Sequence, residues 1–218
     1  MYKSVRLSIA ALATALLFSA NAMAANIAIN GDVETGDLTG FELFPTGNGS
    51  FAEASTVNPS SGAYSLHIVN LQEASAYVVK QPNLAAGQLM PGQEVTISFD
   101  VRGSFGPGGV LFAELFSELD GGGTSASELL GGAPIFPSAN VDEWTTFSFT
   151  TNLGPDVSGG LTLQFAAVTG AVAGSFADVF IDNIVIEADL PAPVPVPAAV
   201  WLMASALGLL GLNRKKAA

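Results

Sequence analysis

Short segments in which apolar and polar residues alternate fill the middle of the chain, and they most constrain its fold. In the clearest of them, QEVTISFDVR (93–102), the residues Val95, Ile97, Phe99 and Val101 share one side of an extended strand. Further segments are GFELF (40–44), AYSLHIVN (63–70), SAYVVKQ (75–81), GVLFAELF (109–116), EWTTFSFTT (143–151), GLTLQFAAV (160–168) and ADVFIDNIVIEA (177–188). Clusters of Gly, Asn, Pro and Ser separate them. The pattern predicts an all-β fold, an antiparallel β-sandwich or barrel over residues 25–188.

One interval between these segments lacks the alternation. Residues 118–140, ELDGGGTSASELLGGAPIFPSAN, are rich in Gly and in small residues. Glycine clusters are typical of turns and loops. We therefore expect the longest loop of the domain here, with one helical turn near Ser125–Leu130.

The N-terminal residues have the pattern of a secretory signal peptide. Lys3 and Arg6 precede a short apolar run, Ile9–Phe18, and Ala22-Met23-Ala24 supplies small residues at the cleavage positions. We expect cleavage after Ala24, so that residues 1–24 are removed. The alternative is an uncleaved N-terminal anchor.

The C-terminal residues have the pattern of a short membrane anchor. A Pro-rich linker (189–197) precedes an uncharged run (198–212) and a basic tail (213–218) that contains Arg214, Lys215 and Lys216. Extended back to Val194, the apolar run is roughly 28 Å long as a helix, marginal for a hydrocarbon core of about 30 Å. Trp201 suits one membrane interface, and the basic cluster predicts a cytoplasmic C-terminus. The central domain would then face outward.

Charge and cysteine content exclude several kinds of partner and site. All nineteen acidic residues lie between Asp32 and Asp189, an interval whose only bases are Lys80 and Arg102, so its formal charge is 2 − 19 = −17. Binding of nucleic acid requires Lys and Arg opposite phosphates, and we expect none here. The chain has no cysteine, which excludes disulfides and thiolate metal sites.

Several phrases of the central domain occur in an order that resembles the carbohydrate-binding modules of the CenC type. They are NGDVETGDLTGF (30–41), SSGAYSLHIVN (60–70), LMPGQEVTISFDVRG (89–103), DEWTTFSFTT (142–151) and VFIDNIVIEA (179–188). The first phrase departs from the family pattern, because Val33 replaces an aromatic residue and Phe41 replaces a Trp. The resemblance implies a galactose-binding-like jelly roll of eight or more strands, which commonly contains one structural calcium ion.

The same resemblance implies where such a calcium ion would bind. It places the ion between an acid near the first strand, Glu34 or Asp32, the carbonyl groups of Ser61 or Gly62, and Asp182. The residues alone also favour a hard cation, because carboxylate and carbonyl oxygens are the ligands that calcium prefers. The alternative is that these acids are surface groups and that the turn residues only form hydrogen bonds.

Asp182 belongs to the last alternating segment, where its orientation is ambiguous. Unbroken alternation puts it on the same face as Phe180, Ile184 and Ile186, where a bare carboxylate would be costly. A bulge at Asp182-Asn183 would turn it outward instead.

Candidate glycan-binding residues are few. Tyr64 and Tyr77 have the amphipathic rings that sugar sites use, and Phe105 and Phe112 flank a glycine-rich turn. Trp144 matches a structural strand of the resembled family and not its binding face.

Catalytic candidates are weaker. His67 is the only histidine, and no triad can be assembled around it. Glu114, Glu118 and Asp120 could form a glycosidase pair, but this spacing is more typical of a solvated edge. We expect a protein without catalytic activity.

The tail sequence VPVPAAVWLMASALGLLGL resembles the PEP-CTERM sorting signal of Gram-negative bacteria, in a variant that lacks Pro-Glu-Pro. The resemblance implies recognition by an exosortase-type membrane protease, which would cut near Pro195–Pro197 and release the domain at the cell surface. Prolines keep this junction extended and accessible. The alternative is an ordinary C-terminal anchor.

The sequence thus predicts an exported, surface-sorted, non-catalytic β-sandwich of the cell envelope or exopolysaccharide matrix. A module that binds extracellular polysaccharide is the alternative, and an orphan hydrolase is a more distant third.

Overall fold

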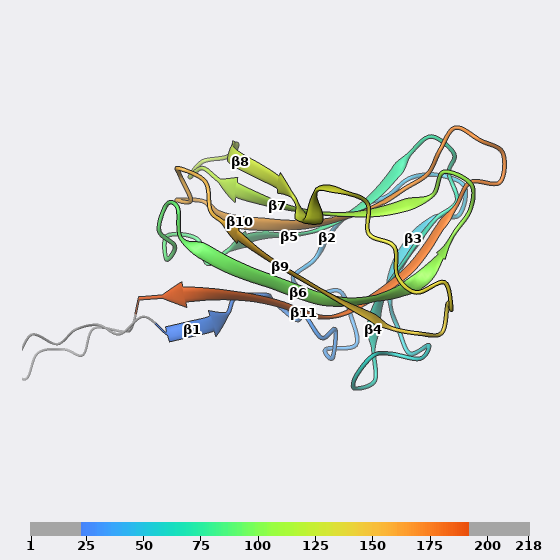
Figure 1. The fold of residues 1–218 in the computed structure, drawn as a ribbon, viewed down its shortest axis with the longest axis horizontal. Coiled ribbons are helices and arrows are strands. Elements are labelled where there is room, and N and C mark those ends of the chain that lie inside the picture. Colours follow the sequence, from blue (N-terminus) through green and yellow to red (C-terminus); the bar gives the residue numbers. More distant parts are fainter. Residues whose placement is uncertain (1–22, 192–218) are drawn as a thin grey trace, which may run out of the picture. The chain divides into compact units, whose positions relative to one another are not determined.

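The alternating segments form two antiparallel sheets that pack face to face (Figure 1). The computed structural model describes residues 23–191. Its strands are β1 (Met23–Asn26), β2 (Glu42–Phe44), β3 (Phe51–Ser55), β4 (Ser65–Asn70), β5 (Ala76–Leu84), β6 (Glu94–Phe105), β7 (Val110–Glu118), β8 (Thr124–Leu129), β9 (Thr145–Asn152), β10 (Gly160–Val168) and β11 (Ala177–Leu190). The predicted all-β antiparallel sandwich is confirmed.

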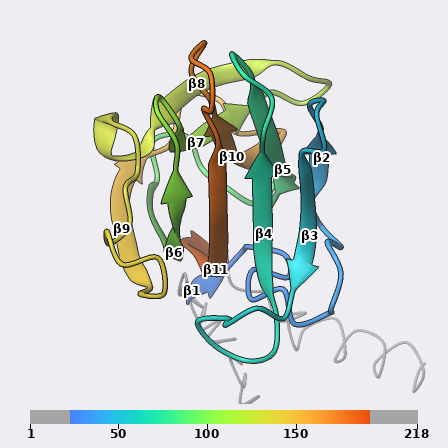
Figure 2. The ribbon, with the colours of Figure 1, turned by 90° about the vertical axis from the view of Figure 1, so that its right-hand side faces the viewer.

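Each sheet has a simple strand order. In the six-stranded sheet the order is β3-β4-β11-β6-β9, and β1 also pairs with the end of β11. Figure 2 shows this sheet from its outer side, with β9 at one edge and β3 at the other. The five-stranded sheet has the order β2-β5-β10-β7-β8.

Three strands lie outside the predicted segments. Two of them, β1 and β3, are short, and the third, β8, falls inside the expected loop 118–140. This part of the prediction is wrong because β8 is a polar edge strand, paired only with β7, and has no apolar side to produce alternation. A single 3₁₀ turn, Leu130–Gly132, follows it, slightly later than the expected helical turn.

The core lies between the sheets and takes one side of nearly every strand. Phe99 of β6 is completely buried and meets Phe165 of β10 edge-on, with ring centroids 5.0 Å apart. Phe147 and Phe149 of β9 extend this aromatic cluster. Apolar burial of this kind is the main favourable term in folding.

A bulge interrupts β11 and decides where Asp182 points. The register against β6 shifts between Asp182 and Val185, and Asn183 has φ 49°. Ile181, Ile184 and Ile186 therefore face the core, whereas Asp182 lies on the outer side. Of the two orientations left open by the sequence, the bulge is the correct one.

Asp182 is nevertheless buried, because the turn of residues 60–64 covers it. One carboxylate oxygen, Oδ2, accepts the N–H groups of Ser60 (2.9 Å) and Ser61 (3.0 Å). At the other end of the turn, Glu34 Oε1 accepts the N–H groups of Ala63 (2.8 Å) and Tyr64 (2.9 Å). Two carboxylates thus hold this turn, which we call the 60–64 turn.

Gly62 is the residue between these two carboxylates. Its φ is +61°, and an added Cβ would collide with the carboxylate of Glu34. Only glycine meets both conditions without strain.

Only small parts of the predicted signal peptide and of the predicted linker fall within the described residues. Met23 and Ala24 of the predicted signal peptide pair with the end of β11, which itself continues to Leu190, two residues into the predicted linker. Between Met23 and Pro191 the structure has no helix that is long and apolar enough to cross a membrane. The candidate sorting residues Pro195, Pro197, Trp201, Arg214, Lys215 and Lys216 lie outside the described residues.

We predict that Gly62→Ala lowers the free energy of unfolding by about 3 kcal/mol. Roughly 1 kcal/mol comes from a side chain at positive φ, and about 1 kcal/mol from each of the two Glu34 hydrogen bonds that the new Cβ displaces. Gly87→Ala is the matched control, because Gly87 has φ +70° and open space around it. Urea denaturation of the two variants measures both losses; equal losses would show that the Glu34 contact adds nothing.

Candidate ligand-binding groove

The outer face of the six-stranded sheet carries a row of directly opposed side chains. Glu53, His67, Phe180 and Arg102 are register partners across β3, β4, β11 and β6. The His67 ring stacks on Phe180 at a centroid distance of 3.9 Å, and the Arg102 guanidinium lies 3.7 Å from the same ring. We call these four residues the cross-strand row.

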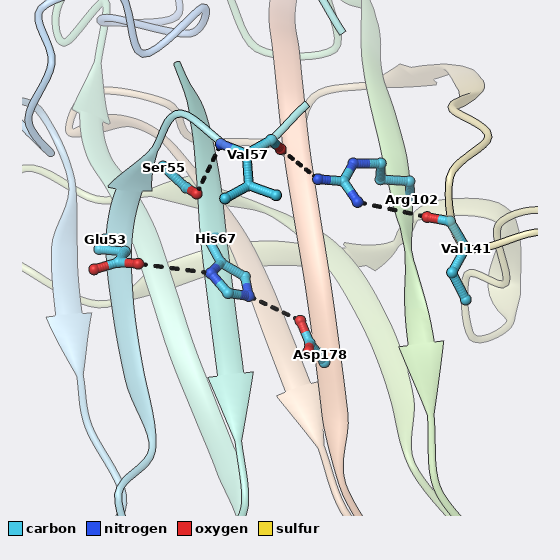
Figure 3. Close-up of polar contacts among 7 residues, drawn as sticks. All are labelled: Glu53, Ser55, Val57, His67, Arg102, Val141 and Asp178. Carbon is cyan, nitrogen blue, oxygen red and sulfur yellow. Dashed lines mark hydrogen bonds and ion pairs between the residues drawn. The ribbon is translucent and has the colours of Figure 1, made fainter. Parts of the chain in front are cut away.

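His67 of the cross-strand row makes its polar contacts within this face (Figure 3), whereas Arg102 Nε is buried without a hydrogen-bond partner among the described residues. His67 Nε2 lies 2.8 Å from Asp178 Oδ1, and His67 Nδ1 lies 3.8 Å from Glu53 Oε1. In the part of the chain that is described, no hydroxyl group is hydrogen-bonded to His67. The histidine serves as a packed, hydrogen-bonded side chain.

Arg102 joins two loops over this face. Its guanidinium donates to the carbonyl oxygens of Val57, after β3, and Val141, before β9 (Figure 3). Burial lowers the pKa of Arg102, while the nearby carboxylates of Asp142 and Asp178 act in the opposite direction. The outer face of the six-stranded sheet is thus covered by the protein's own side chains and loops at this row.

The outer face of the five-stranded sheet is different, because a groove of about 560 Å³ opens there. Four strands contribute to its floor: Phe44 from β2, Lys80 from β5, Thr162 from β10 and Glu118 from β7. The β7–β8 and β9–β10 turns form its wall, where Asp120, Gly121, Gly122 and Ser158 lie.

Alternation explains why these residues reach the groove. In β5 the side chains of Tyr77 and Val79 enter the core, so Lys80 between Val79 and Gln81 must point outward. Across the sheet, Lys80 is directly opposite Glu42 of β2 and Gln164 of β10.

An aromatic side chain and several polar groups meet at this groove. Phe44 is 48% exposed, and the ammonium group of Lys80 lies 5.2 Å from its ring and 5.6 Å from the ring of Phe116. Gln164 donates to Glu114 beside them. Elongated polar ligands with one apolar face fit such a lining, because pockets combine apolar contact area with a few placed polar groups.

The predicted calcium ligands come together only in part. Glu34, Ser61, Gly62 and Asp182 all lie at the 60–64 turn, whereas Asp32 lies on an exposed loop and its Oδ1 is 3.4 Å from the N–H nitrogen of Glu34. Ser61 offers the carboxylate an N–H group and not a carbonyl oxygen. Within residues 23–191, no group of three or more His, Asp or Glu side chains is arranged to hold a metal.

The pKa values of two neighbouring acids at this turn are shifted in opposite directions. Burial raises the pKa of Asp182, and its backbone hydrogen bonds only partly compensate. Burial also acts on Asp100, its partner in β6, but hydrogen bonds from Asn183, Thr146 and Ser60 together lower the pKa of this carboxyl. The environment therefore raises the pKa of Asp182 above its ordinary value and lowers that of Asp100 below it.

The predicted sugar-binding tyrosines lie away from the groove. Tyr77 is a core residue with 3% exposure, and burial raises the pKa of its hydroxyl. Because its ring lies between the sheets, it is not presented to a ligand on either outer face. Tyr64 is half-buried, with its ring against Gly36.

The other aromatic candidates, Phe112, Phe105 and Trp144, lie at three separate positions. Phe112 lies on the outer side of β7, and Phe105 meets Phe136 edge-on at a second hollow of about 430 Å³. Trp144 is held by a hydrogen bond from its Nε1 to the carbonyl oxygen of Asn58 (3.1 Å). Sequence reasoning missed Phe44, Lys80 and Thr162, which stand at alternate strand positions but meet only after β2, β5 and β10 pair.

Comparison with known proteins rests on structure alone. No family model matches the chain, and no curated protein matches its sequence. Among solved structures, a family 16 carbohydrate-binding module is similar with a TM-score of 0.50 and 15% identity, over 74% of this chain and 99% of that one.

Proteins with other activities are similar as well. A Stig cyclase from Fischerella sp. TAU has a TM-score of 0.54 and 18% identity, over 78% of this chain and 100% of that one. The enzymatically active domain of bacteriophage CBA120 tailspike protein 4 has a TM-score of 0.57 and 15% identity, over 74% of this chain; our chain spans 21% of that one. At such identities these likenesses establish the fold only. The chain therefore has the jelly-roll β-sandwich fold found in carbohydrate-binding modules.

Proposed function

We propose that this chain is an exported protein that binds a polysaccharide in the groove of its five-stranded sheet. The observation that carries the proposal is the groove itself, with an exposed aromatic ring and polar groups from four adjacent strands. The likeness to a family 16 carbohydrate-binding module supports it at the level of the fold.

The dimensions and lining of the groove suit an extended sugar chain. Four strands spaced about 4.8 Å apart span roughly 14 Å across the sheet. Phe44 offers an apolar surface to the C–H face of a sugar ring, while Lys80, Asn83 and Ser158 provide polar groups for its hydroxyls. A chain lying across the strands would meet both kinds of group.

We propose binding without catalysis. Glu114 and Glu118 stand four residues apart on β7, which corresponds to roughly 14 Å along a strand. Glycosidases hold their two carboxyl groups about 5–9.5 Å apart, so by this measure Glu114 and Glu118 do not form such a pair. Glu114 also accepts a hydrogen bond from Gln164, which occupies one of its oxygens.

Export and sorting complete the proposal. They rest on the sequence patterns of residues 1–24 and 189–218, nearly all of which lie outside the described residues. The signal peptide would direct export, and an exosortase-type protease would cut near Pro195–Pro197 and release the domain into the surface polysaccharide.

Calcium is not part of this proposal. The oxygens of Glu34 and Asp182 that face the 60–64 turn accept amide N–H groups, and a cation at the same oxygens would compete with those donors. The arrangement favours a turn held by hydrogen bonds, which was the alternative interpretation of these residues.

We predict that Phe44→Ala weakens polysaccharide binding by about tenfold. One aromatic contact contributes about 1.4 kcal/mol, and this free energy corresponds to a factor of ten in affinity. A glycan array with the full-length protein in mild detergent identifies the ligand, and titration calorimetry measures the change. Phe51→Ala on edge strand β3 of the opposite sheet is the matched control and should bind normally. An array without any bound glycan would refute the proposal and leave a structural matrix protein.

We predict that chelation of divalent cations leaves the melting temperature unchanged. A ligand that binds only the native state must raise its stability, so a lost calcium ion would lower the melting temperature. Differential scanning calorimetry with added calcium and with chelator tests this. If chelator lowers the melting temperature, if calcium reverses this and if Glu34→Gln shows no such change, then a calcium ion does bind at this turn.

We predict that deletion of residues 192–218 abolishes sorting. The truncated protein should still be exported but should lose both membrane insertion and surface retention, because its hydrophobic run is gone. Cell fractionation and mass spectrometry of the released C-terminus measure this. Unaltered surface retention of the truncated protein would contradict the sorting step.

A further inference from the structure

We infer that the groove selects polysaccharides that carry free amino groups and rejects polymers of uronic acids. This inference rests on the proposed function and adds the substrate class. It comes from the charges and unpartnered groups that line the groove, and it commits to positively charged amino sugars.

Carboxylates dominate the charge of the groove. Glu42, Glu118 and Asp120 line it, and Lys80 is the single base among its lining residues. Within residues 23–191 the only ion pairs are those of His67, which lies on the opposite sheet, so these three carboxylates have no cationic partner within 4 Å. The other base, Arg102, is also on the opposite sheet and only 5% exposed.

Lys80 does little to offset this charge for an incoming ligand. Its ammonium group lies near the rings of Phe44 and Phe116, and Glu42 is its register partner. The cation–π contacts hold the ammonium group over these two rings, and this one base stands against three lining carboxylates. A uronate carboxylate placed in the groove would therefore meet a net negative field.

The lining carboxylates have oxygens available. Glu118 accepts one hydrogen bond, from Thr124 Oγ1 at 3.2 Å. The side chains of Glu42 and Asp120 form no hydrogen bond in the part of the chain that the structure describes. The backbone N–H of Asp120 donates to Ser158 Oγ, which leaves its carboxylate unbonded there. An ammonium group has three donors and forms its strongest hydrogen bonds with carboxylates.

Thr162 adds a hydroxyl that a ligand in the groove can reach. Its side chain lines the groove and is only 6% exposed, and its hydroxyl has no hydrogen-bond partner among residues 23–191. The oxygen is not sealed inside the protein, so it opens onto the groove and is free to pair with a bound group. A ligand donor on the groove floor would pair with this hydroxyl and with Glu118 beside it.

Charge on the sugar should therefore decide affinity. In titration calorimetry at mildly acidic pH, with the full-length protein in mild detergent, we expect a glucosamine hexamer to bind at least tenfold more tightly than an N-acetylglucosamine hexamer. A galacturonate hexamer should bind most weakly. The preference should shrink at high salt, because screening weakens exposed charge interactions.

Two groove variants test the residues. Asp120→Asn and Glu118→Gln should each reduce the preference for the glucosamine hexamer over its acetylated form by several-fold, and the double variant should reduce it further. Glu94→Gln is the matched control, since Glu94 is exposed on the six-stranded sheet and loses the same charge. Melting temperatures check that each variant is folded.

The outcomes separate this inference from the proposed function. Equal or tighter binding of the acetylated or uronate hexamer, still weakened by Phe44→Ala, would overturn the inference and leave the groove as a polysaccharide site. An unchanged preference in the Glu118 and Asp120 variants would also overturn it. If none of the three hexamers binds, the inference is refuted. The proposed function is refuted only if no glycan on the wider array binds.

Discussion

Nearly every strand of the sandwich has one side in a core that both sheets share, and the other features of the domain depend on this constraint. Residues such as Phe99 and Phe165 pack against each other in the core from opposite sheets. The side chains between them must point outward, where they are either covered or left open. Function can therefore reside only on the two outer faces and in the turns.

The two outer faces meet this constraint in different ways. On the six-stranded sheet, His67, Phe180 and Arg102 stack on one another, and Arg102 holds two loops over them. On the five-stranded sheet, none of residues 23–191 covers the end of β5 in this way, and a groove remains there with Phe44 in its lining. Contacts among the protein's own residues cover the first face, whereas our proposal places the ligand on the second face.

Carboxylates have two separate roles in this acidic protein. Asp182 and Glu34 accept backbone N–H groups and hold the 60–64 turn, a role that needs no partner outside the chain. Glu42 and Asp120 line the groove, and their carboxylates form no hydrogen bond among residues 23–191; in our proposal they set the charge that an incoming ligand meets. Residue type alone does not distinguish these roles; hydrogen-bond partners do.

Alternation in the sequence predicted eight of the strands and the sandwich class, because a strand that is half buried needs an apolar residue at every second position. It could not predict β8, whose edge position leaves both sides polar. It also could not decide the side of Tyr77: both sides of β5 carry apolar residues, and Gln81 is buried with Tyr77 only because its amide bonds the backbone of Ile29.

The sequence by itself determined the strand pattern, the acid excess and the apolar runs at both ends, since these depend only on residue order and composition. Tertiary structure alone decided the direction of Asp182, through a bulge that shifts register, and the meeting of Phe44, Lys80, Thr162 and Glu118. These four residues are up to 118 positions apart in the chain (162 − 44). Strand order brings them together, and strand order follows from how two sheets close one core and not from any local pattern.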